Sequence, residues 1–226
     1  MTEKKTLVVA TKNEHKIAEI AAIAGSFGYV AISRETAGVP DFEIEEHGTT
    51  FEENSMAKAR AIFDYFETEK KNGIIVVADD SGIEADALGG APGIYSARFA
   101  KEEEDANDFA AADIDFEQMH RSRQDRANNA KLLRLLEGTP LEKRTARFVS
   151  VITCLLPDGK EIVCRGKVEG LIDFAETGIE GFGYDPVFIP LGYEKSFGFF
   201  MQDDKNAISH RGRALKELAE NLAGRL

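Results

Sequence analysis

Two adjacent carboxylates, Asp79 and Asp80, follow an apolar run at residues 74–78 and precede Ser81 and Gly82. The apolar run predicts a strand that is buried on both faces. Acids at the end of such a strand are costly to place unless a cation or a ligand uses them. Ligands of open α/β sheets bind beyond the strand ends, and Mg²⁺ commonly takes one or two carboxylates together with substrate phosphates. The pattern therefore indicates a magnesium site for a phosphorylated ligand, with an acidic surface turn as the alternative.

Cationic side chains gather around the predicted start of the last helix: Lys205, His210, Arg211 and Arg213. Positive charge at a helix start opposes the helix dipole. A phosphate bound there would reverse that penalty and accept bidentate hydrogen bonds from Arg211. A solvated basic surface patch is the alternative.

A polar turn at residues 11–16 lies between a predicted strand and a predicted helix. Its hydroxyl, amide and ammonium groups, with the free N–H groups of the helix start, could bind phosphate. The turn could equally do no more than cap the helix. It lacks the Gly-x-x-x-x-Gly-Lys-Ser/Thr pattern, which disfavours the usual nucleoside triphosphatase loop.

Further polar groups could complete a nucleotide site. Asn54 and Lys58 are four residues apart and share a helix face, and Glu43, Glu45 or Glu46 could join the two aspartates at a metal ion. In the loop at residues 181–186, the glycines allow close backbone approach, the aromatic rings could stack on a base, and a carboxylate could accept from base N–H groups. The alternative for the helix and the glutamates is a solvated charged face, and the alternative for the loop is an aromatic anchor that packs into the core. Taken together, these groups suit a magnesium nucleotide.

The periodicity of the chain predicts an α/β fold. The predicted strands span residues 7–10, 74–78, 148–156, 160–168 and 187–189, and helices are predicted from about residue 17 to 25 and over 51–66, 127–137 and 211–222. Strands and helices alternate in the first half of the chain, and a hairpin lies in the second half. This order predicts a mixed sheet in two lobes. The acidic segment at about 101–126 is predicted to be a surface helical excursion or a partly mobile insertion.

Composition excludes several classes of protein. The chain has 226 residues and a net charge of −12, which disfavours broad DNA or RNA binding but not the binding of one nucleotide. No window approaches the roughly 20 apolar residues of a membrane span, and no signal-peptide core precedes the first strand. Cys154 and Cys164 are too few for a disulfide framework. We therefore expect a cytoplasmic protein without a membrane or nucleic-acid partner.

Seven motifs that span nearly the whole chain resemble the inosine triphosphate pyrophosphatase-like family. They are Thr11-x-Asn13-x-x-Lys16, Glu45-Glu46-x-Gly48, Phe51-x-Glu53-Asn54-x-x-x-Lys58-Ala59, Ala78-Asp79-Asp80-Ser81-Gly82, the run from Leu88 to Arg98, the run from Gly181 to Pro186, and Lys205-x-Ala207-x-Ser209-His210-Arg211-Gly212. The resemblance implies one domain over 1–226 with an elongated mixed sheet flanked by helices, two lobes, a central cleft and usually a homodimer. It implies hydrolysis of nonstandard purine nucleoside triphosphates (ITP, dITP, XTP) to the monophosphate and pyrophosphate, which cleanses the nucleotide pool.

The resemblance also implies roles for individual residues. Glu45 and Asp80 would hold Mg²⁺, and Asp80 would accept a proton. The phosphate-binding residues would be Thr11, Lys12, Asn13, Glu14, His15, Lys16, Lys58 and Ser81, and the base and sugar would lie against Phe182, Gly183, Tyr184, Asp185, Lys205, His210 and Arg211. These roles move the phosphate away from the last helix. Two rival functions remain: an aspartyl-phosphate phosphatase and a nucleotide-binding module without turnover.

Overall fold

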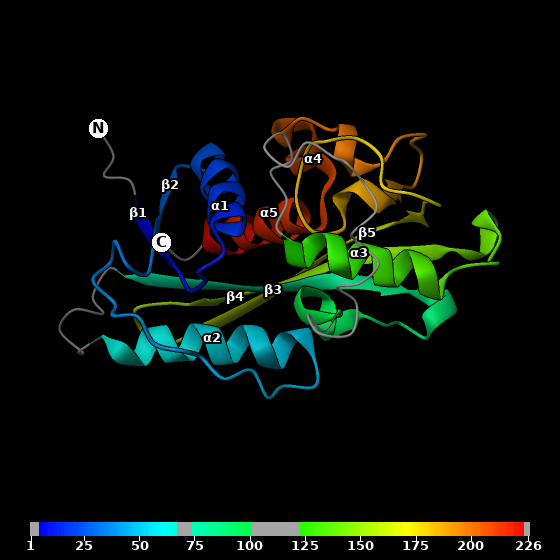
Figure 1. Ribbon diagram of the computed structural model, residues 1–226. Helices are drawn as coiled ribbons and strands as arrows, with labels where there is room; N and C mark the ends of the chain where they lie inside the picture. Colours follow the sequence, from blue (N-terminus) through cyan, green and yellow to red (C-terminus); the bar gives the residue numbers. More distant parts are fainter. Residues whose placement is uncertain (1–4, 67–73, 101–122, 224–226) are drawn as a thin grey trace. The chain divides into compact units, whose positions relative to one another are not determined.

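The computed structural model describes residues 5–66, 74–100 and 123–223 (Figure 1). Its six-stranded sheet has the order β2-β1-β3-β4-β5-β6. The strands are β1 (Lys5–Val9), β2 (Tyr29–Ser33), β3 (Ile75–Ala85), β4 (Thr145–Leu155), β5 (Glu161–Ile172) and β6 (Phe188–Pro190). Strand β1 pairs in parallel with β2 and β3, whereas β5 and β6 are antiparallel. The predicted α/β fold with a mixed sheet is confirmed.

The chain divides into two compact units. The first unit contains Met1–Ser81, Ser150–Lys167 and Ser209–Leu226, and the second contains Gly82–Val149 and Val168–Ile208. Strands β3, β4 and β5 each contribute residues to both units.

In the first unit, helices cover both faces of the strands. Helices α1 (Glu14–Ser26) and α5 (His210–Ala223) lie on one face and α2 (Phe51–Tyr65) lies on the other (Figure 1). Because side chains alternate along a strand, Leu7 and Val9 pack in the cluster with α1 and α5, whereas Val8 packs with α2. The two clusters also take alternate side chains of β3, the strand that carries Asp79 and Asp80.

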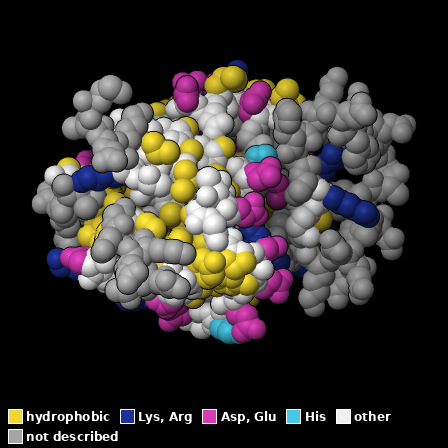
Figure 2. Space-filling model, turned by 90° about the vertical axis from the view of Figure 1, so that its left-hand side faces the viewer, with side chains coloured by type: hydrophobic (Ala, Val, Ile, Leu, Met, Phe, Trp, Pro, Cys, Tyr) yellow, Lys and Arg dark blue, Asp and Glu magenta, His cyan; other side chains and the backbone are white. Residues whose placement is uncertain are grey.

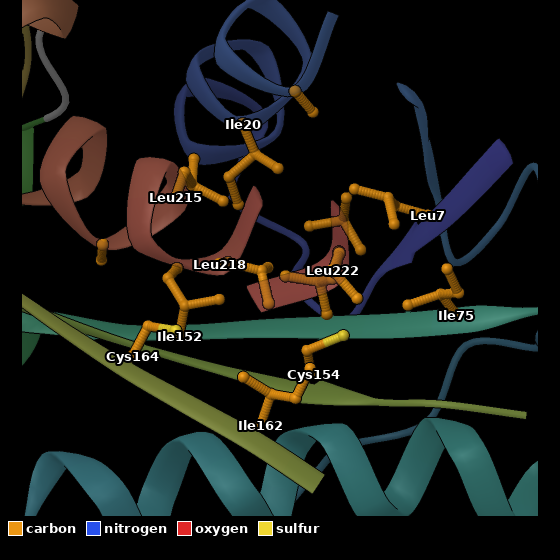
Figure 3. Packing of buried hydrophobic residues seen from close by; sticks show 14 of the residues in the cluster. Leu7, Ile20, Ile75, Ile152, Cys154, Ile162, Cys164, Leu215, Leu218 and Leu222 are labelled. Atoms are coloured by element: carbon orange, nitrogen blue, oxygen red, sulfur yellow. The ribbon is translucent and has the colours of Figure 1, made fainter. Parts of the chain in front are cut away.

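The cluster beneath α1 and α5 is built from strand and helix side chains that point toward one another (Figure 3). Both cysteines lie within it as free thiols. Burial raises the pKa of Cys154 to about 12 and that of Cys164 to about 11, so both thiols stay protonated at neutral pH. Their contribution is therefore to packing.

Side-chain hydrogen bonds cap the first turns of α1 and α2, the helices that carry Lys16 and Lys58. Asn13 Oδ1 accepts a hydrogen bond from the Lys16 N–H at 3.1 Å and caps α1. Thr50 Oγ1 accepts one from the Glu53 N–H at 3.1 Å and caps α2, as the sequence pattern predicts. The caps fix the first residue of each helix and therefore the helix positions of Lys16 and Lys58.

The second unit is organised around aromatic packing. Phe148, Phe188 and Phe197 form one buried cluster, with the Phe148 and Phe188 ring centroids 4.7 Å apart. Its helices are α3 (Arg123–Leu135) and α4 (Gln202–Ile208). The Arg144 guanidinium donates to the carbonyls at the end of α3 and at the end of β5, which joins the two elements.

The element boundaries differ from the sequence prediction most clearly at β3 and α3, and two elements were not predicted. Strand β3 continues through Asp79 and Asp80 to Ala85, so the two acids lie within the strand rather than after it. Helix α3 begins at Arg123 and therefore takes in the last four residues of the predicted insertion, whose residues 101–122 lie outside the described part of the chain. Strand β2 and the short helix α4 were not predicted, because β2 is only half-buried and α4 has seven residues.

Acidic side chains (magenta) stand among hydrophobic ones (yellow) on the face drawn in Figure 2, in keeping with the negative net charge. Within the described ranges, no helix combines the length and apolarity needed to cross a membrane.

Candidate functional site

Asp79 is the centre of a buried charge cluster in the first unit. Its carboxylate lies 2.8 Å from Lys16 Nζ and 3.1 Å from Arg211 Nη2. It also accepts hydrogen bonds from Ser81 Oγ at 3.0 Å and from Ser150 Oγ at 2.6 Å. We call Lys16, Asp79, Ser81, Ser150 and Arg211 the Asp79 cluster. It draws side chains from α1, β3, β4 and α5 around one fully buried anion.

The cations of this cluster keep Asp79 ionised. Burial by itself would raise the pKa of Asp79, but the charges of Arg211 and Lys16 hold that pKa well below its usual value. Arg211 is only 1% exposed and also pairs with Glu19 of α1. Burial lowers the pKa of Arg211, but Asp79 and Glu19 more than offset that effect and raise it. Together with Glu19, the cluster holds two cations and two carboxylates, so its formal charges balance.

Asp80 has a different environment from its neighbour. Its Oδ1 accepts a hydrogen bond from Lys58 Nζ at 2.6 Å, and Lys58 also lies 3.1 Å from Glu46 Oε2. Its Oδ2 is buried and has no hydrogen-bond partner among the described residues. Burial raises the pKa of Asp80 in spite of the nearby Lys58 and Lys16. Asp80 therefore has one carboxylate oxygen available to a proton or a cation.

The structure brings only part of the predicted phosphate turn into this region. Lys16 reaches Asp79, and Asn13 caps α1. Thr11 Oγ1 accepts from the Asn13 N–H at 3.2 Å, Lys12 pairs with Asp41, and Glu14 and His15 are exposed. Apart from Lys16, the turn acts here as a helix cap. Its contact with phosphate stays a prediction.

Among the acids at residues 43–46, Glu46 rather than Glu45 approaches Lys58, the partner of Asp80. Glu45 pairs with His47 at 2.7 Å, and its side chain is 79% exposed. No group of three or more His, Cys, Asp and Glu side chains among the described residues is arranged to hold a metal ion. Glu45 as a metal ligand stays a prediction. The buried Asp80 Oδ2 fits the hard oxygen donors that Mg²⁺ takes.

In the second unit, residues 181–186 form a tightly held loop, which we call the aromatic loop. Asp185 Oδ2 accepts hydrogen bonds from the Phe182 N–H at 2.8 Å and from Lys205 Nζ at 2.6 Å. The Lys205 ammonium lies 4.5 Å from the centroid of the Phe182 ring. Gly181 has φ +75°, and a Cβ there would meet the Asp185 carboxylate. The loop therefore presents a ring beneath a buried cation.

Most of the residues predicted to frame the base and sugar are buried, namely Tyr184, Asp185, Lys205, His210 and Arg211. Tyr184 is 5% exposed and donates its hydroxyl to the Ser96 carbonyl at 2.7 Å, so it anchors the aromatic loop. His210 begins α5 in the first unit and is 4% exposed. Their contact with a base or sugar stays a prediction.

Sequence reasoning missed several partners of these groups. Ser150 lies in an apolar run, where a buried hydroxyl requires a hydrogen-bond partner, and that was an available signal. Glu19 follows Lys16 by one helical turn, but nothing in that spacing indicates a partner near the other end of the chain. Asp125 and Asn129 of α3, which bond to the aromatic loop, carry no motif.

A family profile, curated relatives and solved structures each match almost the entire chain. The profile of the Ham1 family matches residues 7–221. The chain is 44% identical over 220 residues to a dITP/XTP pyrophosphatase of Clostridium perfringens, which covers 97% of this chain and 98% of the relative. It is 42% identical to a dITP/XTP pyrophosphatase of Nitratidesulfovibrio vulgaris, over 96% of this chain and 95% of the relative. The solved Ham1 protein of Staphylococcus aureus matches with a TM-score of 0.76 and 36% identity, over 98% of this chain and 100% of that one.

Proposed function

Because the chain belongs to the Ham1 family, we propose that it hydrolyses nonstandard purine nucleoside triphosphates, namely dITP, ITP and XTP, to the monophosphate and pyrophosphate. Such a reaction removes these nucleotides from the pool. The names of relatives that match over nearly their whole length support the substrate class. The structural observation that carries the proposal is the contrast between Asp79, whose charge is fully compensated, and Asp80, which keeps one oxygen available.

The proposed chemistry is attack of water on the α-phosphorus with pyrophosphate as the leaving group. A raised pKa makes Asp80 a better proton acceptor than an ordinary carboxylate. Lys16 and Lys58 are the cations nearest the two aspartates, and they would stabilise the charge that develops on the phosphate oxygens. Asp79 would keep Lys16 and Arg211 in place without itself taking up a proton, because its pKa is held low.

We propose Mg²⁺ as the cofactor, held by Asp80 together with Glu45 or Glu46. Its oxygen ligands would be carboxylates, which this ion prefers. A bound Mg²⁺ would supply charge neutralisation at the phosphate oxygens. Substituting each glutamate by glutamine distinguishes the two ligands, because loss of a ligand raises the Mg²⁺ concentration needed for half-maximal activity. We expect that rise in only one of the two variants.

The aromatic loop is proposed to contact the purine base through Phe182 and Lys205. An aromatic ring and a cation together suit a planar ring that carries oxo groups. From the family resemblance we further propose a homodimer. A cytoplasmic location without nucleic-acid or membrane partners is proposed from the net charge of −12 and the two free cysteines.

A product assay tests the proposed reaction. The purified protein is incubated with XTP, ITP, dITP, GTP and ATP, with and without Mg²⁺, and the products are separated by ion-exchange chromatography. We expect monophosphate and pyrophosphate in equal amounts, formed faster from XTP, ITP and dITP than from GTP and ATP. Release of inorganic phosphate would instead favour an aspartyl-phosphate phosphatase, and tight binding without products would favour a binding module.

The variant Asp80→Asn tests the proton acceptor. An amide cannot accept the proton, so we expect kcat to fall by at least about a hundredfold. Asp158→Asn is the matched control, because Asp158 lies in an exposed turn of the first unit, where it pairs with Lys160. Turnover near the wild-type value in Asp80→Asn would remove Asp80 from this role.

A further inference from the structure

One helix binds both backbone polar groups of a residue at the centre of the aromatic loop. The Gly183 N–H donates to Asp125 Oδ2 at 3.1 Å, and the Gly183 carbonyl accepts from Asn129 Nδ2 at 3.0 Å. Asp125 and Asn129 are four residues apart and therefore share a face of α3. These two bonds, which we call the Gly183 clamp, set the orientation of the peptide groups on both sides of Gly183.

The asparagine of the clamp is committed to this task. Asn129 is fully buried, and its amide nitrogen also donates to Glu176 Oε1 at 2.6 Å. A primary amide has two N–H donors, so both are used, one by the aromatic loop and one by the segment that precedes it. A buried amide with these partners is costly to disturb, because any lost bond leaves a buried polar group unsatisfied.

The Gly183 clamp restricts a backbone position that glycine itself leaves free to rotate. It has φ +59° and no Cβ, so its own side chain does not restrict the backbone. The residues on either side carry the functional groups: Phe182 lies beneath Lys205, and Tyr184 is anchored to Ser96. Rotation of the peptide groups at Gly183 would move the Phe182 ring relative to its fixed neighbour.

We propose that Asp125 and Asn129 are positioning residues that determine selectivity for the purine base by fixing the conformation of the aromatic loop. The proposal rests on the proposed function, in which Phe182 contacts the base. A site rejects analogues strongly only when its recognition groups are held in place. Loosening the clamp therefore reduces discrimination between oxo- and aminopurines. The bond-breaking groups around Asp79 and Asp80 belong to other elements and keep their geometry.

The experiment compares kcat and KM for XTP and ATP in matched variants. Asn129→Leu removes both donors at similar volume, and Asp125→Ala removes the acceptor. Asp125→Asn keeps a side-chain oxygen that can accept from the Gly183 N–H, and it is the conservative rescue. We expect the ratio of kcat/KM for XTP to that for ATP to fall about tenfold in Asn129→Leu and Asp125→Ala, which corresponds to about 1.4 kcal/mol. We expect the lower ratio to come from a higher KM for XTP, while kcat changes less than twofold.

Asn128→Ala controls for general destabilisation of α3. Asn128 is the adjacent buried asparagine, but its amide bonds to Ala100 and Ser96 instead of Gly183. The Ser96 carbonyl still accepts from the Tyr184 hydroxyl when the Asn128 amide is removed, so this anchor of the aromatic loop is kept. We expect this variant to lose stability and to keep the wild-type selectivity ratio. The proposal is overturned if Asn128→Ala shifts the ratio as much as Asn129→Leu does. It is also overturned if Asp125→Ala and Asp125→Asn behave alike.

Phe182→Ala separates this proposal from the proposed function. If Phe182→Ala loses selectivity but the clamp variants keep it, the clamp proposal is wrong and the role of the aromatic loop stands. If Phe182→Ala keeps full selectivity, the assignment of the loop to the base is wrong and the clamp proposal is overturned with it. If the wild-type protein forms no monophosphate from XTP, the proposed function itself has failed.

Discussion

The two units each bury a carboxylate against a buried cation, but they use it differently. Asp79 in β3 takes two cations and two hydroxyls, all from side chains on four regular elements. Asp185 accepts from the ammonium of Lys205 and from the backbone N–H of Phe182 in its own loop. Asp79 compensates the charges of Lys16 and Arg211, whereas Asp185 holds the backbone of the aromatic loop in one conformation.

The difference explains why each unit suits its proposed task. Phosphate chemistry needs cations that stay fixed while charge develops, and a compensated cluster on helices and strands provides them. Base recognition needs a surface of particular shape, and a glycine-containing loop can adopt one when other elements hold it. Asp79 and Asp185 are thus both buried ion-pair residues, but the first acts through its charge and the second through its hydrogen-bond geometry.

The largest predicted effect is the loss of charge at Asp79. Asp79→Asn leaves Lys16 and Arg211 buried with one anion fewer, and we expect the free energy of unfolding at pH 7 to fall by about 3–5 kcal/mol. Asp185→Asn keeps an oxygen that can accept from the Phe182 N–H and removes the charge that faces Lys205, so we expect its loss of stability to be smaller. Urea unfolding of both variants measures the two losses. Equal losses would break the contrast between the two carboxylates.

Much of the first unit can be predicted because local patterns determine it. Continuous apolar runs predict β1 and β3 as strands that are buried on both faces, and helical spacing predicts the buried faces of α2 and α5. The strand length at Asp79 could not be predicted in this way. β3 continues because Lys16 and Arg211, which are far apart in sequence, compensate the acid inside the sheet.

The second unit shows a different limit of prediction. The glycines and aromatics of residues 181–186 indicate a loop that could approach a ligand. The elements that hold this loop were not predictable, because Asp125 and Asn129 have no spacing that refers to Gly183. The choice between Glu45 and Glu46 was equally open, since adjacent residues in an irregular segment can point in either direction.

The second predicted effect is a pH dependence of stability that comes from Asp79. Its pKa is lower in the folded protein than in the unfolded chain, so its contribution is complete above the unfolded value of about 3.9 and is lost as the pH falls through the folded value. One such group contributes a slope of up to about 1.4 kcal/mol per pH unit. We expect the free energy of unfolding to fall between pH 5 and pH 3, and to fall less steeply in Asp79→Asn. Urea titrations at half-unit pH steps measure both slopes, and parallel slopes would contradict the assignment.

The smallest predicted effect concerns Tyr184, which anchors the aromatic loop without charge. Tyr184→Phe keeps the buried ring and removes the hydrogen bond to the Ser96 carbonyl, so we expect a loss of about 1 kcal/mol in the free energy of unfolding. The carbonyl keeps the Asn128 amide as a donor at 3.2 Å, which limits the cost.

This loss should not depend on pH between 5 and 8. Burial raises the pKa of Tyr184, so its hydroxyl stays protonated throughout that range. Urea unfolding at pH 5 and at pH 8 measures the difference between the variant and the wild-type protein. If the loss in the free energy of unfolding changed with pH, Tyr184 would interact with a group that titrates between pH 5 and pH 8. The hydrogen bonds of the aromatic loop would then depend on charge as those of Asp79 do, and the distinction between a charge-compensated unit and a shape-determined one would not hold.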